Sequence, residues 1–345
     1  MAQTDAKSRV LFWLRIAVSV GLLAVLIHNR PDLNGAIPTQ HQARTITLLA
    51  LGVSMAALGV VLSAWRWQRV LRVYGENASL PRLTMHTLVG LTVSNVLPST
   101  IGGDVVRVAR LSKDISNSEV AFASVALERL TGFIALPVVG IAGFILRPSL
   151  LTSDQAWLAI LISGITLGLL GAILITAAHP KAAGRFAERE GWVRFIGAVH
   201  IGVDQLRRAP KQAGAVLVAA LCYQASVVAS VVLIAAAIEI PAPIAAVIAF
   251  VPAVAMVQVV PISMNGLGVR EGMLIRLLGP LGLTHGQAVA LGLLWGASLL
   301  LISVAGVPAV MAGRKREIAT AADARELTSA IPSSSQRGRQ TYWEW

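Results

Sequence analysis

The sequence contains few charged residues and a single cysteine. Charged residues make up 13% of the 345 positions, whereas hydrophobic residues make up 55%. A soluble globular protein carries roughly 25% charged residues, so this composition excludes an ordinary soluble domain. The one cysteine, Cys222, excludes an intrachain disulfide and any metal motif built on paired cysteines.

Sequence motifs for covalent chemistry are also missing. The chain has no GxxxxGK[ST] nucleotide loop, no HExxH zinc motif and no GxSxG nucleophile turn. We therefore expect no cofactor, no metal site and no catalytic residue, and we do not expect the protein to act as an enzyme on its own.

What the sequence has instead is a series of apolar runs. Roughly 20 residues cross the hydrocarbon core as a helix, so these runs predict an all-α, polytopic helical membrane protein. Six runs are long enough for full spans: 10–28, 45–65, 130–146, 157–178, 213–238 and 286–312. Two more, Leu83–Pro98 and Ile244–Pro261, are shorter, and each ends at a proline.

Positive charge lies mainly beside the apolar runs. The formal net charge is +12, and this distribution is typical of cytoplasmic loops that face anionic lipid, not of a nucleic-acid-binding protein. The basic segments are 66–82, 181–211 and 314–316, and the nearly uncharged ones are 147–156 and 239–243. We expect a multi-pass protein of the bacterial inner membrane with both termini cytoplasmic, an uncleaved signal anchor as its first span, and a disordered tail at 313–345.

The six long spans already place the basic loops inside and the nearly uncharged loops outside. The two short segments therefore make no net crossing of the membrane. We therefore expect re-entrant hairpins at 83–119, entering from the inside, and at 243–285, entering from the outside. Eight full crossings would keep the same end points and stay open as an alternative.

The two hairpin segments resemble each other. At a constant offset of 163, Pro98-Ser-Thr-Ile-Gly-Gly-Asp-Val-Val-Arg107 aligns with Pro261-Ile-Ser-Met-Asn-Gly-Leu-Gly-Val-Arg270. The expected topology gives the two halves opposite orientations, which is typical of inverted-repeat transporters. We predict one transmembrane domain, 1–312, with repeats at about 45–147 and 208–312.

The residues of these segments suggest a polar cavity. Prolines stop a helix and glycines permit a tight turn, so Pro98, Gly102, Gly103, Pro261, Gly266 and Gly268 are the predicted turn residues. Non-helical backbone and charged side chains occur within the hydrocarbon core only where protein groups or water form hydrogen bonds or ion pairs with them. Arginine suits phosphate, so we expect Arg107 and Arg270 to bind an anionic headgroup.

Other polar residues complete the candidate site. The candidate substrate-binding residues are Arg107, Arg270, Asp104, Glu271, Glu128, Arg129 and Asn95. Either Glu128 or Arg129 can reach a charge of the first hairpin, for instance Glu128 to Arg107. In the alternative reading the charges anchor loops at the membrane interface. Trp65-Arg66-Trp67 is expected to form an interfacial aromatic belt with a snorkelling arginine, and the alternative for this motif is a headgroup contact.

The motifs resemble those of a known family. Asn95-x-x-Pro98-x-x-x-Gly-Gly-Asp104-x-x-Arg107, Glu128-Arg129-Leu130 and Pro261-x-x-x-x-Gly266-x-Gly268-x-Arg270-Glu271 are similar to the lysylphosphatidylglycerol synthetase transmembrane-region family (UPF0104), over about 10–312. The resemblance implies a flippase-like integral membrane protein. In the synthetases this unit moves an aminoacylated phospholipid made by a fused cytosolic domain. That domain is not in this sequence, and other members are associated with polyprenyl-linked sugars, glycolipids or hopanoids.

We therefore expect a flippase or lipid transporter whose partners are membrane lipids and a separate lipid-modifying enzyme. Two alternatives stay open. One is an accessory subunit that presents a lipid to that enzyme, and the other is a transferase with Asp104 or Glu271 as base. The sequence leaves the oligomeric state open.

Overall fold

The computed structural model describes residues 17–22, 24, 41–96, 102–178, 192–260 and 263–312. Every regular element within these ranges is a helix, which confirms the all-α class. The α-helices are α2 (Gln42–Val73), α3 (Leu80–Val96), α4 (Gly102–Ile115), α5 (Ser118–Leu146), α6 (Asp154–Ala178), α8 (Trp192–Arg208), α9 (Pro210–Ala237), α10 (Ile244–Gln258), α11 (Val269–Leu278) and α12 (His285–Ser303). Short 3₁₀ turns are η1 (Pro148–Thr152), η2 (Met264–Gly266), η3 (Gly279–Leu281) and η4 (Val304–Gly306).

Five helical stretches in the described ranges are long and apolar enough to cross a membrane. They are Gln42–Val73, Ser118–Leu146, Asp154–Ile175, Pro210–Ala237 and His285–Ala312. They coincide with five of the six predicted spans, so the protein is a polytopic helical membrane protein. Of the sixth, 10–28, the structure describes only residues 17–22 and 24, which are helical. The predicted tail, 313–345, lies outside the described residues.

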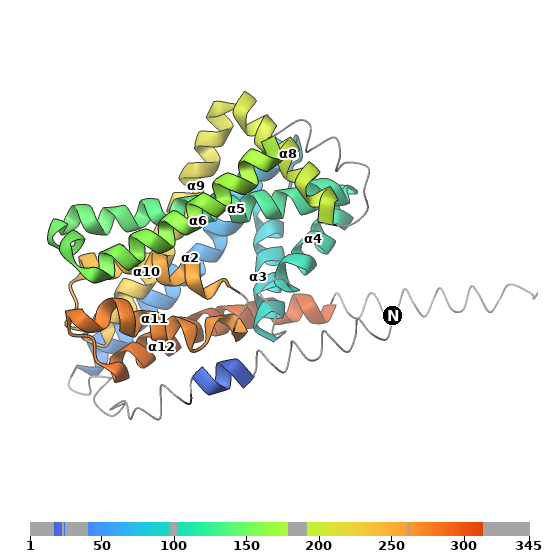
Figure 1. The fold of residues 1–345 in the computed structure, drawn as a ribbon. Helices are drawn as coiled ribbons and strands as arrows, with labels where there is room; N and C mark the ends of the chain where they lie inside the picture. The colour runs from blue at the N-terminus through green and yellow to red at the C-terminus, as the bar shows by residue number, and fades with distance from the viewer. Residues whose placement is uncertain are drawn as a thin grey trace, which may run out of the picture.

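The two short apolar segments form helical hairpins. Helices α3 and α4 have 17 and 14 residues, and α10 and α11 have 15 and 10. At 1.5 Å per residue none reaches the roughly 30 Å of the hydrocarbon core, which favours two hairpins over eight full crossings. Figure 1 shows α3 and α4 toward one end of the bundle and α10 and α11 toward the other.

The order of elements is the same in the two halves of the chain. In each half two short helices stand between two long ones: α3 and α4 between α2 and α5, and α10 and α11 between α9 and α12. Adding 163 to the bounds of α3 gives 243–259, against Ile244–Gln258 for α10. This order agrees with the predicted repeat, and the inverted relation of the halves stays a prediction.

The turn of the second hairpin uses residues that tolerate left-handed backbone. Gly266 has φ 76°, Gly268 has φ 82° and Asn265 has φ 49°. In the first hairpin Gly102 and Gly103 are instead the first two residues of α4. A Cβ on Gly103 would collide with Ser94 and Gly90 of α3, so this glycine allows α3 and α4 to pack closely. The predicted turn residues Pro98 and Pro261 lie outside the described residues.

The first hairpin is fastened to the end of the last helix. Thr92 Oγ1 in α3 donates to the Ser303 carbonyl at 2.6 Å, and Arg110 Nη2 in α4 donates to the Ala309 carbonyl at 2.7 Å. Both helices of the hairpin are thereby attached to the C-terminal part of the span that α12 begins.

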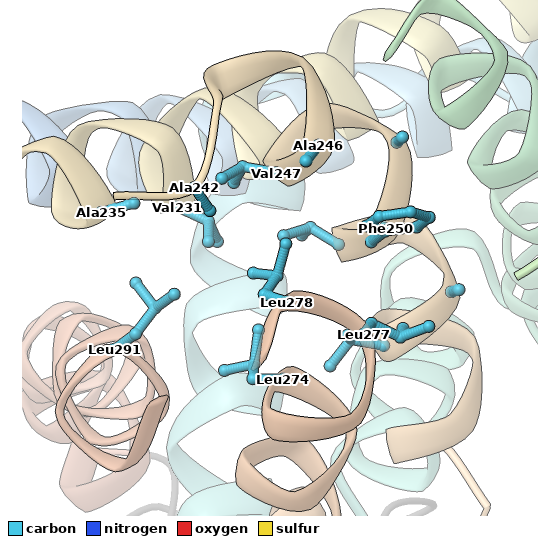
Figure 2. Close-up of a cluster of buried hydrophobic side chains, with 14 of the residues drawn as sticks. Val231, Ala235, Ala242, Ala246, Val247, Phe250, Leu274, Leu277, Leu278 and Leu291 are labelled. Atoms are coloured by element: carbon cyan, nitrogen blue, oxygen red, sulfur yellow. The ribbon is translucent and has the colours of Figure 1, made fainter. Parts of the chain in front are cut away.

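The largest apolar core surrounds the second hairpin. Phe250 of α10 and Leu274, Leu277 and Leu278 of α11 pack with Leu291 of α12 and with side chains of α9 (Figure 2). All five of these residues are fully buried. The second hairpin is therefore held by close apolar packing, the main source of helix association within a lipid bilayer.

Segment 181–211, which the sequence predicts as a basic cytoplasmic loop, contains a helix. Residues 192–208 form α8, which packs against α5 and α6. Its basic residues Arg207 and Arg208 lie in the last turn, where cations interact favourably with the helix dipole.

Candidate functional site

The bundle contains a partly open cavity of about 260 Å³. Side chains from α2, α3, α4, α5, α9, α10 and α12 line it. The charged lining residues in the described part of the chain are Arg66, Asp104, Arg107, Glu128 and Arg129. They come from α2, α4 and α5, so the charge of this cavity belongs to the first half of the protein.

Glu128 joins two arginines inside this cavity. Its side chain is 1% exposed. Its Oε1 accepts hydrogen bonds from Arg66 Nη2 and from Ser63 Oγ, the latter at 3.0 Å. Its Oε2 lies 3.0 Å from Arg107 Nη1, which confirms the predicted contact between Glu128 and Arg107. One carboxylate therefore holds two guanidinium groups.

The two guanidinium groups keep donors that Glu128 does not use. Arg66 and Arg107 are 4% and 5% exposed, and their Cζ atoms lie 4.6 Å and 4.2 Å from the ring centroids of Tyr223 and Trp67. Within the described residues no acceptor bonds Arg66 Nε and Nη1 or Arg107 Nε and Nη2. A buried donor without an acceptor costs about 1–3 kcal/mol, and more when it is charged. These donors are suited to an anion entering the cavity.

The expected interfacial position of Arg66 is wrong. Its neighbours Trp65 and Trp67 are typical of an aromatic belt, but Arg66 points inward and pairs with Glu128. A Cβ on Gly132 of α5 would lie 2.6 Å from Arg66 Nη1, so this glycine leaves the room that the guanidinium needs. The separation of 62 residues between Arg66 and Glu128 gives no local sequence signal for the pair.

Asp104 and Arg129 form the outer part of the cluster. Arg129 donates to Asp104 through Nε at 3.0 Å and Nη2 at 2.9 Å, and Arg107 Nη1 donates to Asp104 at 3.3 Å. The Arg129 side chain is 48% exposed and that of Asp104 is 20% exposed. This bidentate pair therefore lies at the rim of the cavity, while Arg66, Arg107 and Glu128 lie inside.

Arg270 and Glu271 form a separate buried pair. Arg270 donates to Glu271 Oε1 through Nε at 3.1 Å and Nη2 at 2.9 Å, and the Gly268 backbone N–H donates to Oε2 at 2.6 Å. The two residues are 3% and 0% exposed. Neither lines the cavity, although Arg270 lies over the ring of Trp295, which does. The structure therefore does not bring Arg270 to the cavity that Arg107 lines.

The two hairpins meet at their tips. Asn265 Nδ2, in the turn of the second hairpin, donates to Asn95 Oδ1 near the end of α3 at 2.9 Å. Gln258, at the end of α10, lines the cavity, whereas Asn95 does not. Asn95 thus contacts the opposite hairpin.

Comparison with known proteins places the chain in a family. Residues 12–306 match the family described as the lysylphosphatidylglycerol synthase TM region. The chain is also similar to a UPF0104 membrane protein of Methanothermobacter thermautotrophicus, with 30% identity over 100 residues. That similarity covers 28% of this chain and spans 28% of the relative's length. Since the family match extends over most of the sequence, the chain belongs to the lysylphosphatidylglycerol synthase TM region family.

Proposed function

We propose that the protein moves a lipid across the membrane by passing its headgroup through the central cavity. The lipid is a phospholipid, a glycolipid or a polyprenyl-linked lipid, and its apolar tails stay in the bilayer. The observation that carries this proposal is the pair of buried guanidinium groups, Arg66 and Arg107: both residues line the cavity, and both keep donors that no acceptor among the described residues bonds. The family supports a role connected with membrane lipids.

The physical obstacle to lipid movement is the charge of the headgroup. A charged group at the centre of a bilayer costs at least about 3 kcal/mol, and more without water or a partner. Guanidinium N–H donors replace the hydration of a phosphate and form paired hydrogen bonds with it. When no headgroup is bound, Glu128 keeps Arg66 and Arg107 together. Asp104 and Arg129 form the rim that a headgroup passes.

The setting of this activity is also part of the proposal. We assign the protein to the bacterial inner membrane with both termini in the cytoplasm, so the first hairpin enters from the cytoplasmic side. The sequence has no nucleotide-binding loop, so movement runs downhill or couples to an ion gradient. The proposed activity needs no cofactor and forms no covalent bond.

The test is lipid translocation by the full-length protein in liposomes that carry headgroup-labelled lipids. Arg107→Gln removes the charge that faces the cavity, and we expect translocation to slow at least about tenfold. Arg82→Gln is the matched control, because Arg82 lies in the same hairpin but is 60% exposed and has only a 3.9 Å ion pair with Asp114. Arg107→Lys, which keeps the charge but loses the planar donor array, should give an intermediate rate. Unchanged translocation in an Arg66→Gln, Arg107→Gln double variant would reject the site.

The same preparation separates the alternatives. Binding of lipid without translocation would indicate a subunit that presents lipid to a separate enzyme. Product formed from an activated donor would indicate a transferase.

A further inference from the structure

We infer that His86 of α3 and Asp114 of α4 form a proton-binding site, and that the proton it takes is coupled to the anion that enters the cavity. His86 Nε2 lies 2.8 Å from Asp114 Oδ2. Neither residue lines the cavity, so the proton site and the anion site are separate. The inference rests on the proposed function and deepens it, because it names the ion whose uptake accompanies the headgroup.

The pair leaves one nitrogen of the imidazole unused. An ionised Asp114 can only accept a hydrogen bond, so His86 Nε2 carries the hydrogen that they share. Within the described residues nothing bonds the buried Nδ1 of His86. The His86 side chain is 9% exposed, whereas that of Asp114 is 26% exposed. Nδ1 is therefore the atom that can take a proton, and the carboxylate that would stabilise the resulting imidazolium is in contact with water.

The charges around the imidazole decide how readily it takes the proton. Asp114 favours the imidazolium, while Arg110 of α4 and Arg82 of α3 disfavour it. Arg82 is 60% exposed, so water and salt screen its charge. From α2, the ring of Trp67 faces His86 with 6.4 Å between the ring centroids. An unperturbed histidine changes charge between about pH 5 and 8, so a further negative charge near this site would promote proton uptake in that range.

Trp67 connects the pair to the cavity. The Arg107 Cζ atom lies 4.2 Å from the centroid of the Trp67 ring, and Arg107 lines the cavity. The indole is held in place because its Nε1 donates to Ser124 Oγ at 2.9 Å. An imidazolium at His86 is thus separated by one aromatic ring from the arginine that binds the anion. The two opposite charges attract each other across this ring.

The helices that carry the pair also position Arg107. On α4, Arg107 precedes Asp114 by seven residues, and on α3, Gly90 follows His86 by four, which are about two turns and one turn. A Cβ on Gly90 would lie 2.8 Å from Arg107 Cγ, so α3 and this arginine are in close contact. Protonation changes the link between His86 and Asp114 from a hydrogen bond to an ion pair, and it therefore acts on the same contact of α3 with α4.

The sign of the coupling follows from these charges. The protonated form of His86 favours the anion, so the anion binds more tightly at low pH. By thermodynamic reciprocity, the bound anion raises the proton affinity of His86 by the same factor. A singly charged headgroup that moves together with one proton carries no net charge, so a proton gradient can drive its movement.

Histidine NMR on the full-length protein in detergent tests the proton site directly. The chain has six histidines, and the signal of His86 is the one that His86→Gln removes. The probe is dihexanoyl phosphatidylmethanol, whose phosphodiester stays singly charged across the titration. We expect His86 to titrate between about pH 5 and 8, with a midpoint that rises when the lipid is added. No titration in this range, or a midpoint that the lipid does not move, would overturn the inference.

Calorimetric titration with the same lipid measures the coupling from the other side. The unsubstituted protein should bind it about fivefold more tightly at about pH 5.5 than at about pH 7.5. His86→Gln, whose amide can still donate to Asp114, should bind equally at both. His285→Gln is the matched control, because His285 is exposed at the start of α12, and it should keep the pH dependence.

A second variant serves if His86→Gln does not fold. Asp114→Asn removes the carboxylate that stabilises the imidazolium, so the signal of His86 and the pH dependence of binding should both move to lower pH. A pH dependence that His86→Gln retains, or that Asp114→Asn leaves in place, would assign the proton to another group and overturn the inference.

Liposomes separate this inference from the proposed function. A pH gradient across the membrane should speed the translocation of a headgroup-labelled anionic lipid by the unsubstituted protein but not by His86→Gln. If both move lipid equally and without regard to the gradient, the coupling is wrong while lipid transport stands. If binding is linked to pH through His86 but no lipid moves, the transport proposal fails while the coupled proton site stands.

Discussion

The two hairpins occupy matching places in the chain, yet they use arginine differently. In the second hairpin one arginine, Arg270, meets one carboxylate, Glu271, and a backbone N–H takes the other carboxylate oxygen. Both residues are buried, and they belong to α11, whose Leu274, Leu277 and Leu278 pack in the largest apolar cluster (Figure 2). Beside the first hairpin, Glu128 of α5 contacts two arginines, Arg66 of α2 and Arg107 of α4, and Arg107 also donates to Asp104. In the second hairpin the two opposite charges balance each other. The cavity cluster has more guanidinium groups than carboxylates and therefore keeps unused donors.

The difference arises outside the shared motif. The second arginine of the first cluster, Arg66, comes from α2, and the position 163 residues later is Ala229. The carboxylate also moves: Glu128 corresponds to Leu291, and Glu271 corresponds to Val108. Arg107 and Arg270 are thus matched in sequence while their partners are not.

The largest expected effect concerns the enclosed pair. Glu271→Gln leaves the charge of Arg270 buried without a counterion, and breaking such a pair costs about 3–5 kcal/mol. We expect a correspondingly lower free energy of unfolding in a denaturing-detergent titration. Glu239→Gln is the control, because its partner Arg44 is 59% exposed and an exposed pair contributes about 0–1 kcal/mol. Similar losses in the two variants would mean that Glu271 does not act as a buried counterion.

The second prediction compares Glu128 with Glu271 directly. Glu128→Gln also leaves buried arginines short of a counterion, but its cavity can admit an anion. A short-chain anionic phospholipid at about 100 times its Kd for this variant should add about 2.7 kcal/mol to its free energy of unfolding, and at the same lipid concentration it should add less to the unsubstituted protein, whose cavity is less positive. The same lipid should add no more to Glu271→Gln than to the unsubstituted protein, since the lipid does not reach that pair. Thermal unfolding with and without lipid measures both, and preferential rescue of Glu271→Gln would reverse the comparison.

A smaller effect is expected from filling the space beside Arg66. A Cβ at position 132 would lie 2.6 Å from Arg66 Nη1, so Gly132→Ala must displace the guanidinium at a cost of about 1–3 kcal/mol. Translocation should fall with it. Gly164→Ala in α6 is the control, because nothing lies within 4 Å of its added Cβ. Normal transport by Gly132→Ala would show that the position of Arg66 is unimportant.

The smallest expected effect is the contact between the hairpin tips. Asn95→Ala and Asn265→Gly each remove the hydrogen bond between these residues. A double-mutant cycle on the free energy of unfolding should give a coupling of about 0.5–1.5 kcal/mol, the usual net value of one hydrogen bond. A coupling of zero would mean that the tips do not depend on each other for stability.

Much of the fold could be predicted from the sequence because apolar length is a strong signal. The five long spans follow from their runs, and the hairpins follow from segments too short to cross. The contact between Arg107 and Glu128 was predictable, since a buried charge needs a partner of opposite sign.

The partners of the other charges could not be predicted from local pattern. Arg66 lies between two tryptophans, a pattern typical of the membrane interface, but in the structure it points inward to Glu128 of α5 and Tyr223 of α9. Adjacent helical residues point about 100° apart, so Arg270 and Glu271 give no pattern typical of a pair. They meet because Glu271, in the first turn of α11, reaches back to the Gly268 N–H.

Both helices of the first hairpin, α3 and α4, are attached to the last span, and this attachment has a mechanical consequence. Thr92 and Arg110 donate hydrogen bonds to carbonyls near the end of that span. A tilt of the last span would therefore also displace α4 and its residue Arg107. Such a tilt would also act on the second hairpin, because Leu291 of α12 belongs to the apolar cluster that contains Phe250 of α10 and Leu274 of α11.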